Sequence, residues 1–283
     1  MIRIRHIAAN WTQKETSILE LFDIKISPGF KSFTLAEDDK YRELMKKLTS
    51  SQKGFLAKSG LKDFRDILVS AKFSEEELQR ASYFWLQTEN FGYPFPKIIN
   101  KYRKQVFQEV CLYNKSENCC GYHGKQKAPF FIDAIPKTNV PNLLFSLHWE
   151  QDTLFTTKEL YEEFFKRKGF EVLDVYLKSN KNKLNDLVQL KLSVSPFSLN
   201  LRDSDLKNTL EKCPCCGHAR YGIRITDFMP PFTEDPNIDF FLTQETFGSG
   251  GETFRRICIS NSFLKELKAY YKIKDHNLIP SYH

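Results

Sequence analysis

The chain has 283 residues, of which 41% are apolar and 27% charged, a composition typical of a soluble globular protein with one or two domains. The net charge of +7 allows an acidic protein or nucleic acid as a partner but requires neither. No stretch approaches the roughly 18 apolar residues of a membrane helix, and the N-terminal segment lacks the apolar core of a signal peptide. The seven cysteines, an odd number, do not resemble a secreted disulfide framework. These features predict a cytoplasmic protein without a membrane partner.

The first third of the chain carries helical patterns. Apolar side chains recur at helical spacing in residues 36–48, and residues 62–73 favour a second, shorter helix. A third helix is expected over residues 73–87, because Ser74 and Glu77 have the spacing of a capping box.

The two prolines of the segment NFGYPFPK end this helical pattern, since proline lacks the N–H that a helix needs. We therefore predict a mainly helical N-terminal region over residues 1–98. The remainder, residues 99–283, contains short apolar runs such as 142–149 that favour strands, separated by polar loops.

The segment CPCCG contains a C-x-x-C pair, Cys213 and Cys216, followed by Gly217. Two thiolates at this spacing on a tight turn can bind one zinc ion at about 2.3 Å, and the glycine permits the positive φ that such a turn needs. Cys215 is then a spare thiol, and His218 is a weaker alternative ligand. A thioredoxin-like role is disfavoured, because the motif does not lie between a strand and a helix of a βαβ unit.

The segment CCGYHG, upstream, has the same pattern with histidine in the second ligand position. Imidazole is an accepted zinc ligand at about 2.0–2.1 Å. We therefore predict a zinc site formed by Cys120, His123, Cys213 and Cys216, in which Cys119 could replace Cys120. Four protein ligands leave no open coordination position, so the predicted zinc is structural rather than catalytic.

The regions after the two motifs resemble each other. Asp133 follows Cys120 by thirteen residues and Asp227 follows Cys213 by fourteen, and in both cases a proline comes three residues later. This shared order indicates an internal duplication.

Further along, each half contains a short apolar strand that meets a hydroxyl residue, Thr157 or Ser260, and then an amphipathic helix. Both hydroxyl residues are predicted to be N-caps. We place the copies at about residues 104–195 and 196–283. The predicted fold class is α+β, with a helical N-terminal region followed by a duplicated strand and helix unit that contains the zinc motifs.

At these motifs the sequence resembles the double-CXXCG motif family of bacterial proteins. The resemblance also extends to the strand and helix segments 154–176 and 257–279, and it covers about residues 104–283. The family pattern has C-x-x-C-G twice, whereas His123 stands here in place of one cysteine. Members of this family are associated with contact-dependent toxin systems as immunity proteins. The resemblance implies a cytoplasmic protein that binds and neutralises a cognate toxin.

Two other functions compete with this one. A zinc-containing nucleic-acid-binding protein would use the basic runs at 101–104 and 178–183 for phosphate contacts, but the charge excess is modest and dispersed. An enzyme could use His148 and Glu150, which stand near the end of a predicted strand. A lone His-Glu pair is more typical of structure, and the sequence has no nucleophile elbow, H-E-x-x-H motif or phosphate-binding loop. We therefore predict a binding protein rather than an enzyme.

Overall fold

The computed structural model describes residues 1–50, 64–92, 104–109, 122–135, 143–148, 150–202, 204–222, 228–248, 253–274 and 277–282. The chain forms two compact units. The first comprises Met1–Leu78 with Ile225–Phe228, and the second comprises Gln79–Arg224 with Met229–His283. In the part of the chain that the structure describes, every helix is too short or too polar to span a bilayer.

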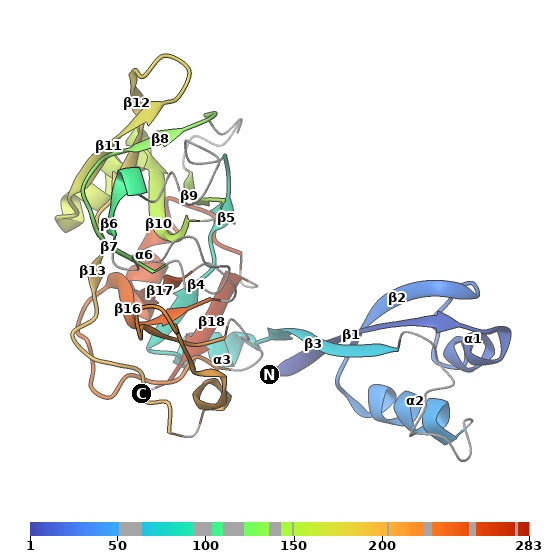
Figure 1. The fold of residues 1–283 in the computed structure, drawn as a ribbon. Coiled ribbons are helices and arrows are strands. Elements are labelled where there is room, and N and C mark those ends of the chain that lie inside the picture. The colour runs from blue at the N-terminus through green and yellow to red at the C-terminus, as the bar shows by residue number, and fades with distance from the viewer. Residues whose placement is uncertain are drawn as a thin grey trace. The chain divides into compact units, whose positions relative to one another are not determined.

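The first unit is a three-stranded antiparallel sheet with two helices (Figure 1). Its central strand β1 pairs with β2 on one side and β3 on the other. The helices α1 and α2 contribute Leu19 and Leu44 to a core that also contains Trp11 of β1. The bounds of these elements are β1 (Ile2–Trp11), α1 (Gln13–Glu20), β2 (Gly29–Ala36), α2 (Asp39–Ser50) and β3 (Arg65–Lys72).

The prediction of a mainly helical N-terminal region, and with it the predicted fold class, is wrong. The helix expected at 36–48 is present as α2, but the described part of the segment 62–73 is strand β3. Residues 1–36 contain the other two strands of the sheet, β1 and β2. Pairing with β1 over seven positions determines the structure of β3, and local helical spacing does not reveal such a distant partner.

The third predicted helix is also shorter than expected. Its capping box is confirmed: the Ser74 backbone N–H donates to Glu77 Oε2 at 2.7 Å, and the Glu77 N–H donates to Ser74 Oγ at 3.2 Å. The helix α3 (Glu75–Arg80) ends early because the next apolar run is strand β4 (Tyr83–Leu86), all four residues of which are buried. A short apolar run that is buried on both faces is typical of a central strand. The described chain is therefore mostly β, with short helices.

The second unit contains two larger sheets. The first sheet has the order β5-β9-β10-β12-β11-β8, and the second has the order β13-β16-β17-β4-β18. The strands of the first are β5 (Glu89–Asn90), β8 (Phe130–Ile132), β9 (Leu144–Leu147), β10 (Glu150–Thr157), β11 (Val172–Leu177) and β12 (Lys183–Leu190). Those of the second, besides β4, are β13 (Ser193–Val194), β16 (Phe240–Phe247), β17 (Phe254–Ser260) and β18 (Leu278–Ser281). The strand expected at 142–149 is confirmed as β9.

Five strands of each sheet follow the same plan (Figure 1). A hairpin, β9-β10 or β16-β17, is followed by a helix and then by an outer strand, β11 or β18. The second hairpin strand pairs antiparallel with a central strand, β12 or β4, which also pairs with the outer strand. Residues 83–177 and 183–281 therefore form two copies of one topology, which we call the first and second copy.

The two copies exchange short strands. After the central strand β4, the chain crosses to the other sheet, where β5 pairs parallel with β9. After the central strand β12, the chain crosses in the opposite sense, and β13 pairs parallel with β16. The central strands are exchanged as well, because β4 of the first copy pairs with the second hairpin and β12 of the second copy pairs with the first. Each sheet is therefore completed by the other copy.

The register of the two copies matches around the two helix N-caps. Thr157 lies opposite Leu187, and Ser260 lies opposite Tyr83. Two positions before these caps, Phe155 pairs with Phe145 in the first hairpin and Cys258 pairs with Phe241 in the second. Because strand register fixes which face each side chain occupies, this agreement gives a reliable list of equivalent positions.

Both predicted N-caps are confirmed. Thr157 Oγ1 accepts from the Leu160 N–H at 3.5 Å, and Ser260 Oγ accepts from the Phe263 N–H at 3.2 Å. The first helix consists of α5 (Lys158–Leu160), a π-turn η1 (Tyr161–Phe165) and a 3₁₀ turn η2 (Lys166–Lys168), whereas α6 (Asn261–Leu267) is regular. The first helix ends at Gly169, whose φ of +79° favours glycine.

Aromatic side chains join the two copies. The rings of Phe164 in the first helix and Phe263 in the second lie 5.0 Å apart between centroids, and Phe240 of β16 lies 5.6 Å from Phe263. These side chains are buried, and edge-to-face or stacked rings add stabilisation beyond the buried area. The phenylalanine-rich composition thus supplies the junction between the copies.

Candidate metal centre

The second cysteine motif forms the turn of a small hairpin. Strands β14 (Glu211–Lys212) and β15 (Ala219–Arg220) pair antiparallel on either side of it. The Cys213 N–H donates to the His218 carbonyl at 2.9 Å, and the Gly217 N–H donates to the Cys213 carbonyl at 2.8 Å. The predicted positive φ is present at Gly217, at +72°. The segment CPCCG therefore folds as the tight turn that two neighbouring thiolate ligands require.

The three cysteines of this turn differ in exposure. Cys213 is buried, Cys215 is half-buried and Cys216 is exposed. None of them takes part in a disulfide between described residues.

Tyr122 connects the first motif to this turn. It lies between the predicted ligands Cys120 and His123 in the sequence, and it packs against Cys213 together with Cys215. Its ring stacks on His218, with centroids 3.6 Å apart and planes 10° apart. The residue at the centre of the first motif is thus in contact with the second motif, about ninety residues away in the sequence.

A hydrogen-bond chain orients His218. Its Nε2 lies 2.7 Å from Thr246 Oγ1, and that hydroxyl donates to the Ala219 carbonyl at 2.8 Å. Since the hydroxyl proton is used in this second bond, Nε2 is the donor to Thr246, and the lone pair of the neutral ring is on Nδ1. Burial, followed by the positive charge of Arg255 and Arg220, lowers the pKa of His218, which favours the neutral ring.

Arg255 of β17 holds the other side of Tyr122. Its Nη2 donates to the Tyr122 hydroxyl at 3.4 Å, and its guanidinium lies 5.9 Å from the ring centroid. The Arg255 backbone N–H donates to Asp152 Oδ2 of β10 at 3.0 Å. Tyr122 is therefore held between the CPCCG turn and strand β17 of the second copy.

The first motif also adjoins two short paired strands. Strands β6 (Phe107–Glu109) and β7 (His123–Gln126) pair antiparallel, with Glu109 opposite His123, so the motif ends inside β7. The connection between β6 and β7 is longer than the one between β14 and β15. Each copy therefore carries its cysteine motif next to two short paired strands.

Of the four predicted ligands, Cys213 and Cys216 lie in the CPCCG turn, and His123 begins β7. Cys120 and its alternative Cys119 lie outside the described residues. Within the described ranges, no group of three or more His, Cys, Asp or Glu side chains is arranged to hold a metal ion. Tyr122 was not among the predicted site residues. Its only signal in the sequence was an aromatic side chain between two predicted ligand positions.

The two residues considered for an active site lie where the two strands of the first hairpin meet. His148 follows β9, where its backbone N–H donates to the Gly92 carbonyl at 3.1 Å, and Glu150 begins β10 with a buried side chain. Comparison with known proteins gave no match: no family model, no curated protein and no solved structure is significantly similar to the chain.

Proposed function

We propose that the chain is an immunity protein that binds and neutralises a cognate bacterial toxin in the cytoplasm, with a structural zinc ion bound by Cys120, His123, Cys213 and Cys216. The contact of Tyr122 with Cys213 and His218 carries this proposal. It supports the zinc site because the two motifs that resemble the double-CXXCG family are neighbours in the fold. The immunity function rests on the same pair of motifs through the family resemblance.

The chemistry of the donor set fits zinc. Three thiolates and one imidazole are a common structural set, and their softness favours zinc over magnesium or calcium. The turn at Gly217 holds two of the thiolate positions ready. Zinc bound there would join the copies through their loops and stabilise the fold by its binding free energy.

His218 keeps its place as the alternative ligand, because its Nε2 donates to Thr246 and the lone pair of Nδ1 is left for a metal. Its ring face is covered by Tyr122. Through this stack, His218 holds the first motif against the second.

An inhibitor that acts by covering a toxin surface needs an interface of about 800 Å² on its own side, with aromatic or arginine anchors. It needs no catalytic group. The double-sheet unit offers a rigid scaffold for such a surface, because each sheet is completed by strands of the other copy.

The function is tested by growth rescue. Each open reading frame next to the gene of this chain is expressed in a bacterial host, alone and together with the chain. We expect one neighbour to arrest growth alone and to be tolerated in coexpression, and the purified pair to co-elute in size-exclusion chromatography.

The matched control uses two cysteines of one turn. Cys213→Ser should abolish rescue because it removes a zinc ligand, whereas Cys215→Ser should preserve it. If no neighbour is toxic, or if the toxic one is not rescued, the immunity function is wrong. Salt-sensitive copurification of nucleic acid in place of a protein partner would favour the nucleic-acid-binding alternative.

A further inference from the structure

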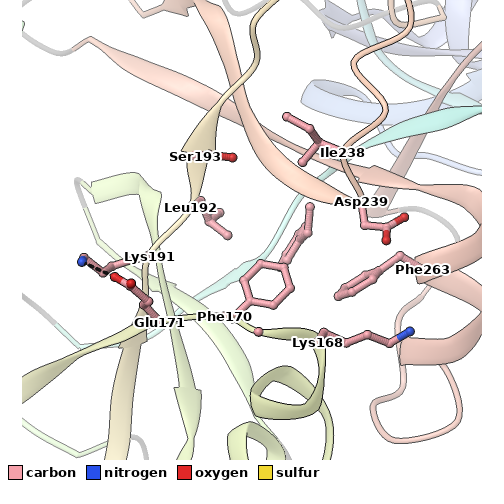
Figure 2. A pocket seen from close by; sticks show the side chains of 11 residues that line it. Lys168, Phe170, Glu171, Lys191, Leu192, Ser193, Ile238, Asp239 and Phe263 are labelled. Carbon is pink, nitrogen blue, oxygen red and sulfur yellow. Dashed lines mark hydrogen bonds and ion pairs between the residues drawn. The ribbon is translucent and has the colours of Figure 1, made fainter.

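A hollow of about 580 Å³ opens in the second unit between segments of both copies (Figure 2). Four segments surround it. They are the turn after the first helix (Lys168–Glu171), the crossover between β12 and β13 (Lys191–Ser193), the start of β16 (Ile238–Phe240) and Phe263 of α6.

The floor of the hollow is aromatic. The Phe263 ring lies 5.7 Å from that of Phe170 and 5.6 Å from that of Phe240, measured between centroids. Figure 2 shows the ring of Phe170 between the crossover strand and Phe263. Such a floor favours a flat, apolar group.

Each charged side chain at the rim of the hollow already has a partner. The partner is either a side chain of opposite charge or a hydrogen-bond donor. Glu171 pairs with Lys191 at 2.6 Å, as the dashed line in Figure 2 marks. Lys168 pairs with Glu266 at 2.6 Å, and Asp239 accepts the Ser260 hydroxyl proton at 2.6 Å. Because these charges are compensated, the hollow complements an uncharged ligand rather than an ion.

The other copy contains an equivalent place. Leu144 corresponds to Phe240, since each pairs with the residue just before the N-cap. Leu160 corresponds to Phe263, since each donates its N–H to the cap hydroxyl.

In both copies an ion pair joins the turn after the helix to the crossover. At the hollow, Glu171 pairs with Lys191, and at the equivalent place Lys274 pairs with Glu89 at 3.6 Å, with the charges exchanged. The same four structural elements therefore surround both places.

In the equivalent place, a tyrosine of the chain itself bridges these elements. Tyr271, in the turn after α6, donates its hydroxyl proton to the Leu144 carbonyl at 3.2 Å. Burial raises the pKa of Tyr271, which keeps the phenol protonated and able to donate.

The corresponding turn at the hollow has no such side chain. Gly169 has none, and a Cβ built there would meet no atom within 4 Å. Lys168 is directed toward Glu266, and Phe170 belongs to the floor. The hollow is thus the place that a tyrosine occupies in the other copy.

We propose that this hollow binds the side chain of a tyrosine presented by a partner protein, with the ring against the partly exposed Phe170 and the hydroxyl donating to the Phe240 carbonyl. The volume exceeds that of a phenol ring and leaves room for the polypeptide that carries it. Tyrosine is also enriched among residues that anchor protein interfaces. The proposal goes beyond the immunity function, because it holds whichever protein carries the tyrosine.

The test is an NMR titration of the ¹⁵N-labelled full chain with N-acetyl-tyrosinamide. We expect saturable shifts at the Gly169 and Ser193 amides with a dissociation constant on the order of 1 mM, as is usual for a ligand of this size. N-acetyl-phenylalaninamide should bind about fivefold more weakly, because it lacks the hydrogen bond to the carbonyl.

Two variants on one strand serve as blocker and control. Ser193→Trp places an indole on the lining of the hollow and should weaken binding at least about tenfold by occlusion. Val194→Trp lies next to it, is 43% exposed and points to the opposite face, so binding should remain as in the wild type.

Three results would overturn the proposal: no saturable shift at the hollow, equal affinity for the phenylalanine analogue, or unchanged binding by Ser193→Trp. If p-cresol binds there and N-acetyl-tyrosinamide does not, the source is a free phenol and the assignment to a partner's tyrosine is wrong. None of these results affects growth rescue, so the two proposals fail independently.

Discussion

The two copies in the second unit agree in backbone register and differ in side chains. Three features occupy equivalent positions in the two copies. They are the N-caps Thr157 and Ser260, the cross-strand pairs two residues before each cap, and the parallel crossover strands β5 and β13. Yet Cys258 stands where the first copy has Phe155, and Gly169 lies in a turn whose counterpart contains Tyr271.

This difference between register and side chains indicates which positions can change without disturbing the shared fold. Hydrogen-bonded register must be kept, because a slip of one residue moves every side chain to the opposite face. Side chains in turns and loops are under no such constraint. The CPCCG motif lies in such a segment, and so does part of the lining of the hollow, the turn that contains Gly169.

The largest expected effect comes from breaking the link between the motifs. Cys213→Ser should remove zinc and lower the free energy of unfolding by at least about 3 kcal/mol, because the binding energy of a structural metal is folding energy. Denaturant titration of wild type and variant, with and without chelator, measures this. Cys215→Ser should change stability by less than about 1 kcal/mol. Equal, small effects for both cysteines would mean that the turn binds no metal.

The next comparison uses equivalent core positions. Phe155→Ala should cost about 3–5 kcal/mol, because Phe155 is fully buried against Phe130 and Phe145. Cys258→Ala should cost only about 1 kcal/mol, because one sulfur atom is lost from an equally buried site. The same denaturant titration compares them. A larger loss for Cys258→Ala would show that the register equivalence does not describe the packing.

The caps give a smaller difference. Ser260→Ala should cost about 1–2 kcal/mol and Thr157→Ala about 0.5–1 kcal/mol, both by loss of a cap. The ranking follows from the shorter cap bond of Ser260, 3.2 Å against 3.5 Å. It also follows from the bond of Ser260 to Asp239 at 2.6 Å, which is shorter than the second bond of Thr157, from the Leu143 N–H at 3.4 Å. Thermal unfolding of the two variants tests the order, and a reversed order would contradict it.

Tyr271→Phe removes only the hydroxyl that reaches the Leu144 carbonyl. We expect a loss of about 1 kcal/mol, the usual net value of a neutral hydrogen bond. Equilibrium unfolding measures it, and Tyr176→Phe, at a half-buried position of β11, is the control. A variant as stable as the control would argue that the tyrosine contributes through its ring alone.

The smallest effect is a pH dependence in the second hairpin. Burial raises the pKa of Glu245 above its ordinary 4.5, although Oε1 accepts the Leu199 N–H at 2.9 Å. Between 4.5 and the raised pKa, the folded state holds a proton that the unfolded chain has lost, so stability falls as pH rises through this window. Glu245→Gln keeps the acceptor and should remove that fall. Identical pH profiles of stability for variant and wild type would contradict this assignment.

Local signals were read correctly from the sequence. The capping box of Ser74 and Glu77, the caps Thr157 and Ser260, and the glycine turn at Gly217 depend on residues that are close in the sequence. Each of these features forms from neighbouring hydrogen-bonding groups, so the pattern and the structure coincide.

Long-range features were missed for the opposite reason. Strand β3 depends on pairing with β1, and β4 is a strand because it lies between β17 and β18, which follow it by about 175 and 195 residues. At the candidate site, the turn could be predicted, but the stack of Tyr122 on His218 depends on how the two motifs meet in space. No local periodicity contains that information.

The central claim, that one zinc ion joins the two motifs, is tested most directly by native mass spectrometry of the purified chain. We expect the mass of the chain plus one zinc ion, lost on chelation and lost in both Cys213→Ser and the double variant Cys119→Ser/Cys120→Ser but retained in Cys215→Ser. A metal-free chain, or zinc that survives the loss of both Cys119 and Cys120, would contradict a site shared between the copies.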